Sequence, residues 1–176
     1  ITDMKLEYLM ERYLTDNITV YSAMDIVDDT IEKTLDFTDP TKYIIWRVEV
    51  VDPMDRYNIT EPLKKIELLI NGRVREESKD YMYYKYLNPY YRSAYGISHE
   101  LAKNSYFYGF SLHPLELQPS GTVNLSMVNS FKIKMLLNHD VITRMKENKV
   151  QLRLQVWACS YNVFTVIDGL GGLRFI

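Results

Sequence analysis

The sequence predicts an all-β fold for this chain of 176 residues. Three observations support the prediction. Apolar and polar residues alternate in several short runs, turn residues separate these runs, and little of the chain has the pattern of a helix. About eight strands in such an arrangement are typical of an antiparallel sandwich, a barrel or a jelly roll.

Residues 1–14 are the predicted helix. Their apolar side chains recur mostly three or four positions apart, at Met4, Leu6, Leu9, Met10, Tyr13 and Leu14. This spacing would place them on one helical face. Asn17 ends the pattern, and residues 18–27 resemble a first strand because they are rich in β-branched and aromatic residues. We therefore expect residues 1–35 to be a lead-in segment with a short helix and a first strand.

The clearest strand covers residues 41–51, with an apolar centre at Ile44, Ile45 and Trp46. Residues 63–70 and 73–77 then flank Asn71–Gly72. Asn-Gly favours a type I′ turn, in which both central residues need a positive φ, so these two runs predict a hairpin.

Four later segments complete the predicted sheets. Residues 105–112 and 131–137 have the composition of strands, and residues 149–167 are long enough for two. Residues 169–176 would form a final short strand. Residues 78–96 contain seven tyrosines, and we expect them to form a short helix or extended run followed by a long loop.

Composition excludes several classes of function. Cys159 is the only cysteine, so neither an intrachain disulfide nor a cysteine-based zinc site is possible. A formal net charge of −2 provides no field that attracts nucleic acid or an anionic membrane. No run approaches the roughly 18 apolar residues of a transmembrane segment.

The residues that usually perform catalysis do not form a recognisable constellation. The three histidines, His99, His113 and His139, are scattered and match no metal-binding spacing. Ser120 lies in a PSG triplet and not in a nucleophile elbow. The sequence therefore predicts no enzyme, no cofactor and no metal site.

The tyrosine-rich segment is the candidate for contacts between subunits. Its candidate interface residues are Tyr81, Tyr84, Tyr86, Tyr90, Tyr91 and Tyr95. Tyrosine combines a large apolar ring with a polar tip, and it is enriched at protein interfaces. Stacking of single-stranded nucleic acid on the same rings is the alternative, but acidic neighbours offset the nearby basic charge.

Four stretches stand out as motifs: DPTKYIIW (39–46), LLINGRVR (68–75), YFYGFSLHPLELQPSGTVNLS (106–126) and YNVFTVIDGLGGLRFI (161–176). They resemble the C-terminal jelly roll of the major capsid proteins of nucleocytoplasmic large DNA viruses. That family has HPxKxLIW, LLxNGxxR, a YxYxFxLxP strand leading to QPSGTxNxS, and a terminal YNVLxIxxGxGGLxF. Here Asp39 replaces the family's usual His, and Met127 stands where the family commonly has Arg.

The third motif ends in the family signature, whose residues are Gln118, Pro119, Ser120, Gly121, Thr122, Asn124 and Ser126. Proline cannot donate to a strand ladder, and glycine permits a φ that other residues resist. We expect a structural corner that crosses between sheets, in which polar side chains bond backbone groups that a long corner leaves unpaired.

The resemblance implies an eight-stranded antiparallel jelly-roll sandwich over residues 36–176. Family members carry two jelly rolls in tandem, and residues 1–35 would be the lead-in between them. The implied protein is a structural subunit that forms homotrimers of pseudo-hexagonal outline. These capsomers tile an icosahedral virion shell, assembled in the host cytoplasm, and contact neighbouring capsomers and minor capsid proteins without direct contact with nucleic acid.

A jelly-roll carbohydrate-binding module of an adhesin or fibre is the alternative, because jelly rolls also occur in lectins. Such a module needs exposed aromatic rings on a concave sheet. Trp46 and Trp157 lie within apolar strands, so we expect both to be buried. A β-fold hydrolase is a third class, and it lacks a plausible triad.

Overall fold

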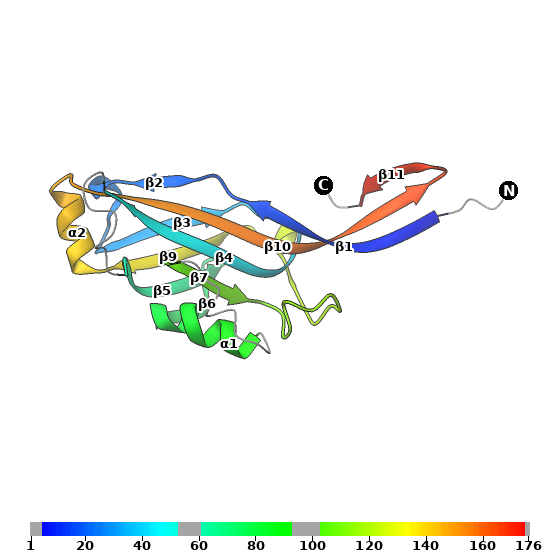
Figure 1. The fold of residues 1–176 in the computed structure, drawn as a ribbon, viewed down its shortest axis with the longest axis horizontal. Helices are drawn as coiled ribbons and strands as arrows, with labels where there is room; N and C mark the ends of the chain where they lie inside the picture. Colours follow the sequence, from blue (N-terminus) through cyan, green and yellow to red (C-terminus); the bar gives the residue numbers. More distant parts are fainter. Residues whose placement is uncertain (1–4, 53–60, 93–102, 175–176) are drawn as a thin grey trace.

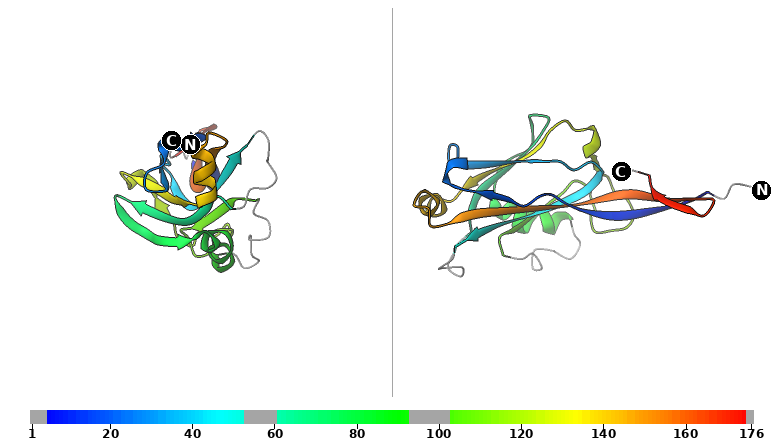
Figure 2. Two further views of the ribbon diagram at one scale, coloured as in Figure 1. Left: turned by 90° about the vertical axis from the view of Figure 1, so that its left-hand side faces the viewer. Right: turned by 90° about the horizontal axis from the view of Figure 1, so that it is seen from above.

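Two antiparallel sheets face each other and enclose the main hydrophobic core (Figures 1 and 2). The structure is a computed structural model that describes residues 5–52, 61–92 and 103–174. The larger sheet has the order β1 (Lys5–Thr15), β10 (Gln151–Ile167), β4 (Pro40–Val51), β7 (Ser105–Gly109). The smaller sheet has the order β3 (Thr30–Leu35), β9 (Phe131–Leu137), β5 (Leu63–Ile70), β6 (Arg73–Asp80).

Short elements complete the fold. Three short strands extend the larger sheet: β2 (Thr19–Tyr21), β8 (Val123–Asn124) and β11 (Leu170–Leu173). The helical elements are η1 (Ala23–Asp25), η2 (Tyr83–Leu87), α1 (Asn88–Arg92), η4 (Leu125–Met127) and α2 (His139–Lys146). The two sheet paths contain eight strands, and the described ranges contain eleven in all, so the predicted count of eight is too low.

The predicted N-terminal helix is wrong where the structure describes it. Residues 5–15 form β1, which pairs with β10 from Lys5↔Ile167 to Thr15↔Trp157. The long strand β10 offers backbone groups that need partners, and pairing with a distant segment overrides the local helical spacing. The start of the predicted helix, residues 1–4, lies outside the described residues.

Three further boundaries differ from the predictions. Residues 18–27 form only the short strand β2 and the 3₁₀ turn η1, in which the Asp25 carboxylate accepts hydrogen bonds from the Ser22 backbone N–H and hydroxyl. Residues 151–167 form one strand and not two. Strand β7 covers residues 105–109, so it ends at Gly109 and not at residue 112 as predicted.

The predicted hairpin is confirmed. Asn71 and Gly72 have φ values of 51° and 72°, as the turn between β5 and β6 requires. The Asn71 side chain also accepts hydrogen bonds from the Asn129 and Ser130 backbone N–H groups, at 2.8 and 3.1 Å. The turn is therefore tied to the segment that leads into β9.

The core lies between the two sheets. Ile44, Trp46 and Val48 of β4 are fully buried against residues of the smaller sheet, such as Ile133. Trp157 is only half-buried, because it lies on the opposite face of β10 from its buried neighbours, and the expectation that it is buried is wrong.

In the described part of the chain, no helix is both long and apolar enough to cross a membrane.

One part of the larger sheet leaves the sandwich. Strand β4 pairs with β10 only as far as Ser160, and beyond this point β10 runs between β1 and β11. Figures 1 and 2 show this ribbon projecting from the body. We call residues 5–10, 162–167 and 170–173 the arm.

Candidate functional site

The signature segment forms a long corner at the root of the arm. We call residues 111–126 the corner. It begins where the Phe110 and Ser111 N–H groups donate to the Lys42 carbonyl at 2.8 and 3.2 Å, and it returns as β8 beside β4. Gly121 has a φ of +117°, which side-chain-bearing residues rarely adopt. The corner therefore depends on glycine at this position.

Signature side chains hold the corner together. The Ser120 hydroxyl accepts a hydrogen bond from the His113 backbone N–H at 2.8 Å. The Asn124 side-chain oxygen accepts from the Ser126 backbone N–H at 3.1 Å and from its hydroxyl at 2.6 Å, which caps η4. The exposed members of the signature include Gln118, Pro119 and Thr122. The corner thus closes largely on itself.

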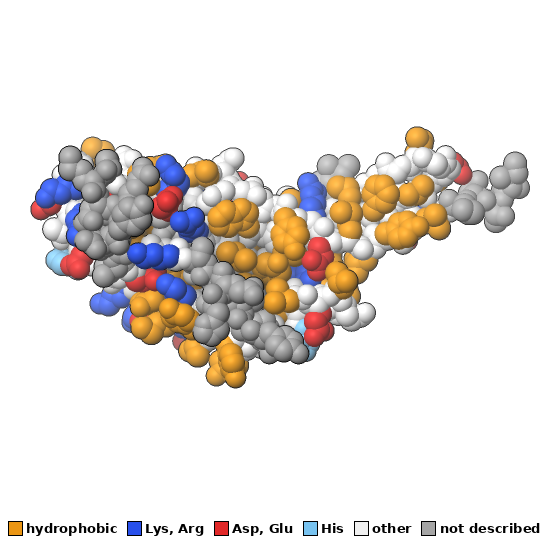
Figure 3. All heavy atoms as spheres, viewed as in Figure 1, with side chains coloured by type: hydrophobic (Ala, Val, Ile, Leu, Met, Phe, Trp, Pro, Cys, Tyr) orange, Lys and Arg blue, Asp and Glu red, His pale blue; other side chains and the backbone are white. Residues whose placement is uncertain are grey.

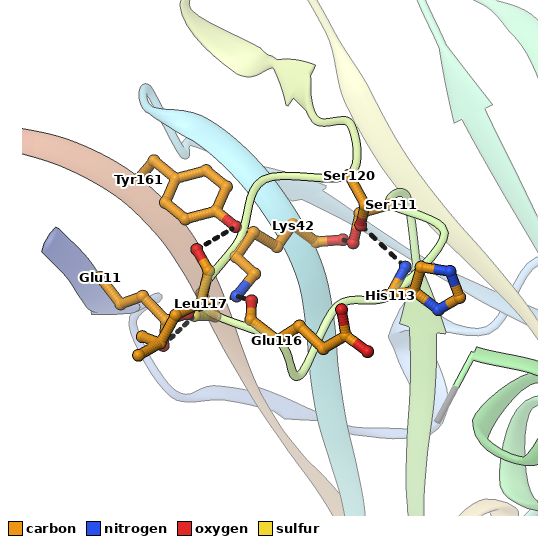
Figure 4. Close-up of polar contacts among 9 residues, drawn as sticks. Glu11, Lys42, Ser111, His113, Glu116, Leu117, Ser120 and Tyr161 are labelled. Carbon is orange, nitrogen blue, oxygen red and sulfur yellow. Dashed lines mark hydrogen bonds and ion pairs between the residues drawn. The ribbon is translucent and has the colours of Figure 1, made fainter. Parts of the chain in front are cut away.

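A buried lysine connects the corner to three strands (Figure 4). Lys42 of β4 is fully buried, and its ammonium forms an ion pair with Glu11 of β1. It also donates to the Glu116 carbonyl of the corner at 2.9 Å and lies 4.9 Å from the centroid of the Tyr161 ring of β10. The Tyr161 hydroxyl in turn donates to the Leu117 carbonyl at 3.5 Å. Lys42 therefore joins residues from three of the four sequence motifs.

A β-bulge explains how a strand lysine reaches these groups. Tyr43 of β4 is opposite Cys159 of β10, but Thr41 is opposite Ser160, so Lys42 has no partner in the register. A bulge inserts one extra residue and redirects its side chain. The bulge thus turns Lys42 toward the arm root and the corner.

The charge of Lys42 is stabilised where it lies. Burial lowers its pKa, but the hydrogen bond and charge of Glu11, with a smaller contribution from Tyr161, outweigh burial and raise the pKa above its ordinary value. Burial raises the pKa of the neighbouring Cys159 thiol, which favours the protonated, unreactive form. This is the chemistry of a structural ion pair and not of a nucleophile.

The two departures from the family motifs have simple surroundings. Asp39 is buried, and Arg12 of β1 lies 3.4 Å from its carboxylate. The Thr41 hydroxyl donates to the Asp39 carbonyl at 3.0 Å and contacts the Ser160 hydroxyl at 2.9 Å. Met127 is 79% exposed. An arginine from β1 therefore compensates the acidic replacement, and position 127 faces solvent.

The structure separates the predicted interface tyrosines into two groups. Tyr84 lies in the core, where its hydroxyl donates to the Ile66 carbonyl at 3.1 Å and its ring packs edge-on against Trp46 at 5.5 Å. It cannot contact another subunit directly, so its assignment to an interface is wrong. Tyr81 is half-buried, and Tyr95 lies outside the described residues.

The remaining tyrosines belong to an exposed apolar surface over η2 and α1. Its members are 46–73% exposed: Met82, Tyr86, Leu87, Tyr90 and Tyr91. We call this surface the helical patch, and Figure 3 shows apolar side chains gathered at the lower edge of the body.

In the described ranges, no group of three or more His, Cys, Asp or Glu side chains could hold a metal ion.

Sequence reasoning did not identify Lys42, Glu11 and Tyr161 as a group. A lysine inside an otherwise apolar strand was the available signal, because a charge at such a position needs a partner. The partner lies on β1, the segment with the helical spacing. Its role could not be inferred while that segment was assigned to a helix.

Fold and site together define a jelly-roll structural protein, whose motif residues meet in a packed junction. The family model described as "Large eukaryotic DNA virus major capsid protein" matches residues 1–172. The chain therefore belongs to this family.

Curated relatives include two major capsid proteins. That of Phaeocystis pouchetii virus is 31% identical over 116 residues, which cover 65% of this chain and 20% of the relative. That of Chrysochromulina ericina virus is 30% identical over 114 residues, which cover 65% of this chain and 18% of the relative. The chain thus aligns with only a small part of these longer proteins.

Solved structures share the fold. The crystal structure of PBCV-1 VP54, fitted into a reconstruction of the virophage Sputnik, superposes with a TM-score of 0.76 at 19% identity, covering 98% of this chain and 52% of that one. The Faustovirus major capsid protein gives a TM-score of 0.68 at 14% identity, covering 89% of this chain and 33% of that one. The described strands are thus arranged as in jelly-roll capsid proteins.

Proposed function

We propose that this chain is a jelly roll of a structural major capsid protein, which forms homotrimeric capsomers of pseudo-hexagonal outline in an icosahedral virion shell. The observation that carries the proposal is the Lys42 junction. Lys42 of DPTKYIIW contacts Glu116 of the third motif and Tyr161 of the fourth, and it pairs with Glu11 of β1. These motifs therefore organise packing between strands. The family match over residues 1–172 supports the same function.

Further parts of the proposal follow from this assignment. The protein acts in the virion, after assembly in the host cytoplasm, and is not an enzyme. Its partners are copies of itself, neighbouring capsomers and minor capsid proteins, without direct contact with nucleic acid. We keep residues 36–176 as the jelly-roll domain, which contains the eight strands β4 to β11, and residues 1–35 as a lead-in whose strands β1, β2 and β3 complete the sheets.

We propose the helical patch as the subunit contact within the trimer. Its composition supports this role, because tyrosine and methionine are enriched at interfaces and buried aromatic anchors dominate their energetics. The ion pair of Lys85 with Glu61 at 2.7 Å fixes the segment to the body. The Lys79 ammonium of β6 also lies 4.1 Å from the centroid of the Tyr83 ring. The patch is therefore displayed on an ordered support.

The test compares trimer strength with fold stability. Tyr91→Ala should raise the trimer dissociation constant about tenfold or more, measured by sedimentation velocity, with little change in melting temperature. Met24→Ala, at a 95% exposed position of η1, is the control and should change neither. If Tyr91→Ala lowered the melting temperature markedly as well as raising the trimer dissociation constant, the result would contradict a role of Tyr91 in the subunit contact. Glycan-array binding by a strictly monomeric chain would instead support the carbohydrate-binding module.

A further inference from the structure

The arm exposes large apolar side chains on both faces. Leu6, Tyr8 and Met10 lie on one face, with exposed fractions of 40%, 54% and 37%, beside Phe164 of β10. Leu9, 54% exposed, lies on the other face. A ribbon of two or three strands is marginal in water unless one face is packed, and clustered exposed apolar groups mark contact surfaces. The arm therefore needs a covering partner.

The arm also has an open edge. Among the described elements, β1 pairs only with β10, so the other side of its eleven residues offers unpaired backbone groups. Edge strands usually avoid pairing through shortness, proline, bulges or added charge. Strand β1 contains no proline, its register with β10 is continuous, and its four charged residues, Lys5, Glu7, Glu11 and Arg12, have no net charge. Its edge is thus suited to accept another strand.

The apolar residues of β1 match a second copy of the same strand. An antiparallel pair centred on Tyr8 places Leu6 opposite Met10 of the other copy and Tyr8 opposite itself, which brings apolar next to apolar. It also places Glu7 opposite Leu9, and Lys5 opposite Glu11, where it adds a positive charge beside a carboxylate that pairs with Lys42 of its own chain. Centring the pair on Leu9 would oppose Glu7 to Glu11, and centring it on Glu7 would oppose that residue to itself. Pairs centred between two residues would bring together side chains of opposite faces.

We propose that β1 of one copy pairs antiparallel with β1 of a second copy, in the register centred on Tyr8. The contact is isologous and follows a twofold axis, whereas a trimer is a ring closed by contacts between unlike surfaces. The arm contact therefore goes beyond the proposed trimer and links subunits of neighbouring trimers.

Cysteine cross-linking tests the register. Cys159 is the only native cysteine and is buried, so an introduced thiol reports its own surroundings. Opposite residues of an antiparallel pair have Cβ atoms about 4.5–5.5 Å apart, close to the separation that a disulfide bridges. Under mild oxidation, Tyr8→Cys should form linked dimers about tenfold faster than Met24→Cys, the exposed control. A mixture of Leu6→Cys and Met10→Cys should link across variants faster than either variant alone.

A blocked edge separates this contact from the trimer. Leu6→Lys places a charge on an exposed edge position, a device by which natural sheets prevent pairing. In sedimentation velocity, wild type should associate beyond the trimer as concentration rises, and Leu6→Lys should stop at the trimer with an unchanged melting temperature. The arm contact would be overturned if wild type and Leu6→Lys sedimented identically and Tyr8→Cys linked no faster than Met24→Cys. That result would not affect the proposed trimer. Absence of a trimer in Leu6→Lys, with fast Tyr8→Cys linking, would instead contradict the proposed capsomer.

Discussion

Replacing Lys42 with methionine removes the charge at the junction of β1, β4, β10 and the corner. Methionine keeps most of the aliphatic volume, so the substitution tests the ion pair more than the packing. It leaves the Glu11 carboxylate without its counter-ion and the Glu116 carbonyl without its donor. Both losses fall on groups that the fold holds at the root of the arm.

The exposure of the two partners sets the size of the effect. Removing one member of a buried ion pair costs about 3–5 kcal/mol. The Lys42 side chain is 1% exposed but Glu11 is 21% exposed, so water still reaches the stranded carboxylate. We therefore expect Lys42→Met to lower the free energy of unfolding by about 2–4 kcal/mol.

Urea unfolding at neutral pH measures this loss, with Lys5→Met as the matched control. Lys5 pairs with Glu7 at 2.8 Å on the surface, where side-chain exposures are 52% and 39%, and such a pair contributes about 0–1 kcal/mol. The double variant Lys42→Met with Glu11→Gln should recover part of the loss, because no charge is stranded. Equal effects of Lys42→Met and Lys5→Met would refute the reasoning.

The pH dependence provides an independent check on the same residue. The folded-state pKa of Lys42 is raised above 10.5, so its stabilising contribution is complete below pH 10.5 and is lost as pH rises through the folded-state value. The difference in stability between wild type and Lys42→Met should therefore shrink in strong alkali. A difference that grows above pH 10.5 would contradict this assignment.

Three further substitutions test other parts of the structure. Tyr84→Ala removes a core side chain and should destabilise the fold by about 3–5 kcal/mol. Tyr91 is 73% exposed, so Tyr91→Ala should change the stability of dissociated subunits by less than about 0.5 kcal/mol. Equal shifts of the melting temperature in the two variants would contradict the placement of Tyr84 in the core and Tyr91 on the surface. Gly121→Ala should cost about 1–3 kcal/mol in urea unfolding, because φ is +117° there, and a neutral result would contradict that backbone conformation. Burial raises the pKa of Glu61 above 4.5 despite the opposing charge of Lys85. The stabilising contribution of this group is therefore present below pH 4.5 and is lost as pH rises through the folded-state pKa. Wild type should lose stability relative to Glu61→Gln from pH 4.5 upward, and a relative gain would contradict the raised pKa.

Local patterns predicted the parts of the fold that depend on neighbouring residues. The Asn71–Gly72 turn follows from backbone conformation alone, and the alternating pattern of β9 corresponds to its alternating burial. Strand β1 could not be predicted in this way, because its partner β10 is far along the chain and its own apolar residues lie on both faces. Helical spacing and a two-faced strand give the same sequence signal here.

The site was predictable as a corner but not as a junction. Pro119 and Gly121 indicated a long turn, and Ser120 and Asn124 form the kind of local bonds expected there. The role of Lys42 depends on a bulge and on Glu11, and both arise from strand pairing. Likewise, only packing distinguishes Tyr84 in the core from Tyr91 on the surface, since both lie in the same tyrosine-rich run.

The capsid assignment is tested most directly by the mass of the assembled species. Native mass spectrometry of Leu6→Lys, in which arm pairing is blocked, should show a complex with three times the 20.8 kDa mass of one chain. Such a trimer is what the account predicts. A folded chain that remains monomeric at every concentration would contradict it.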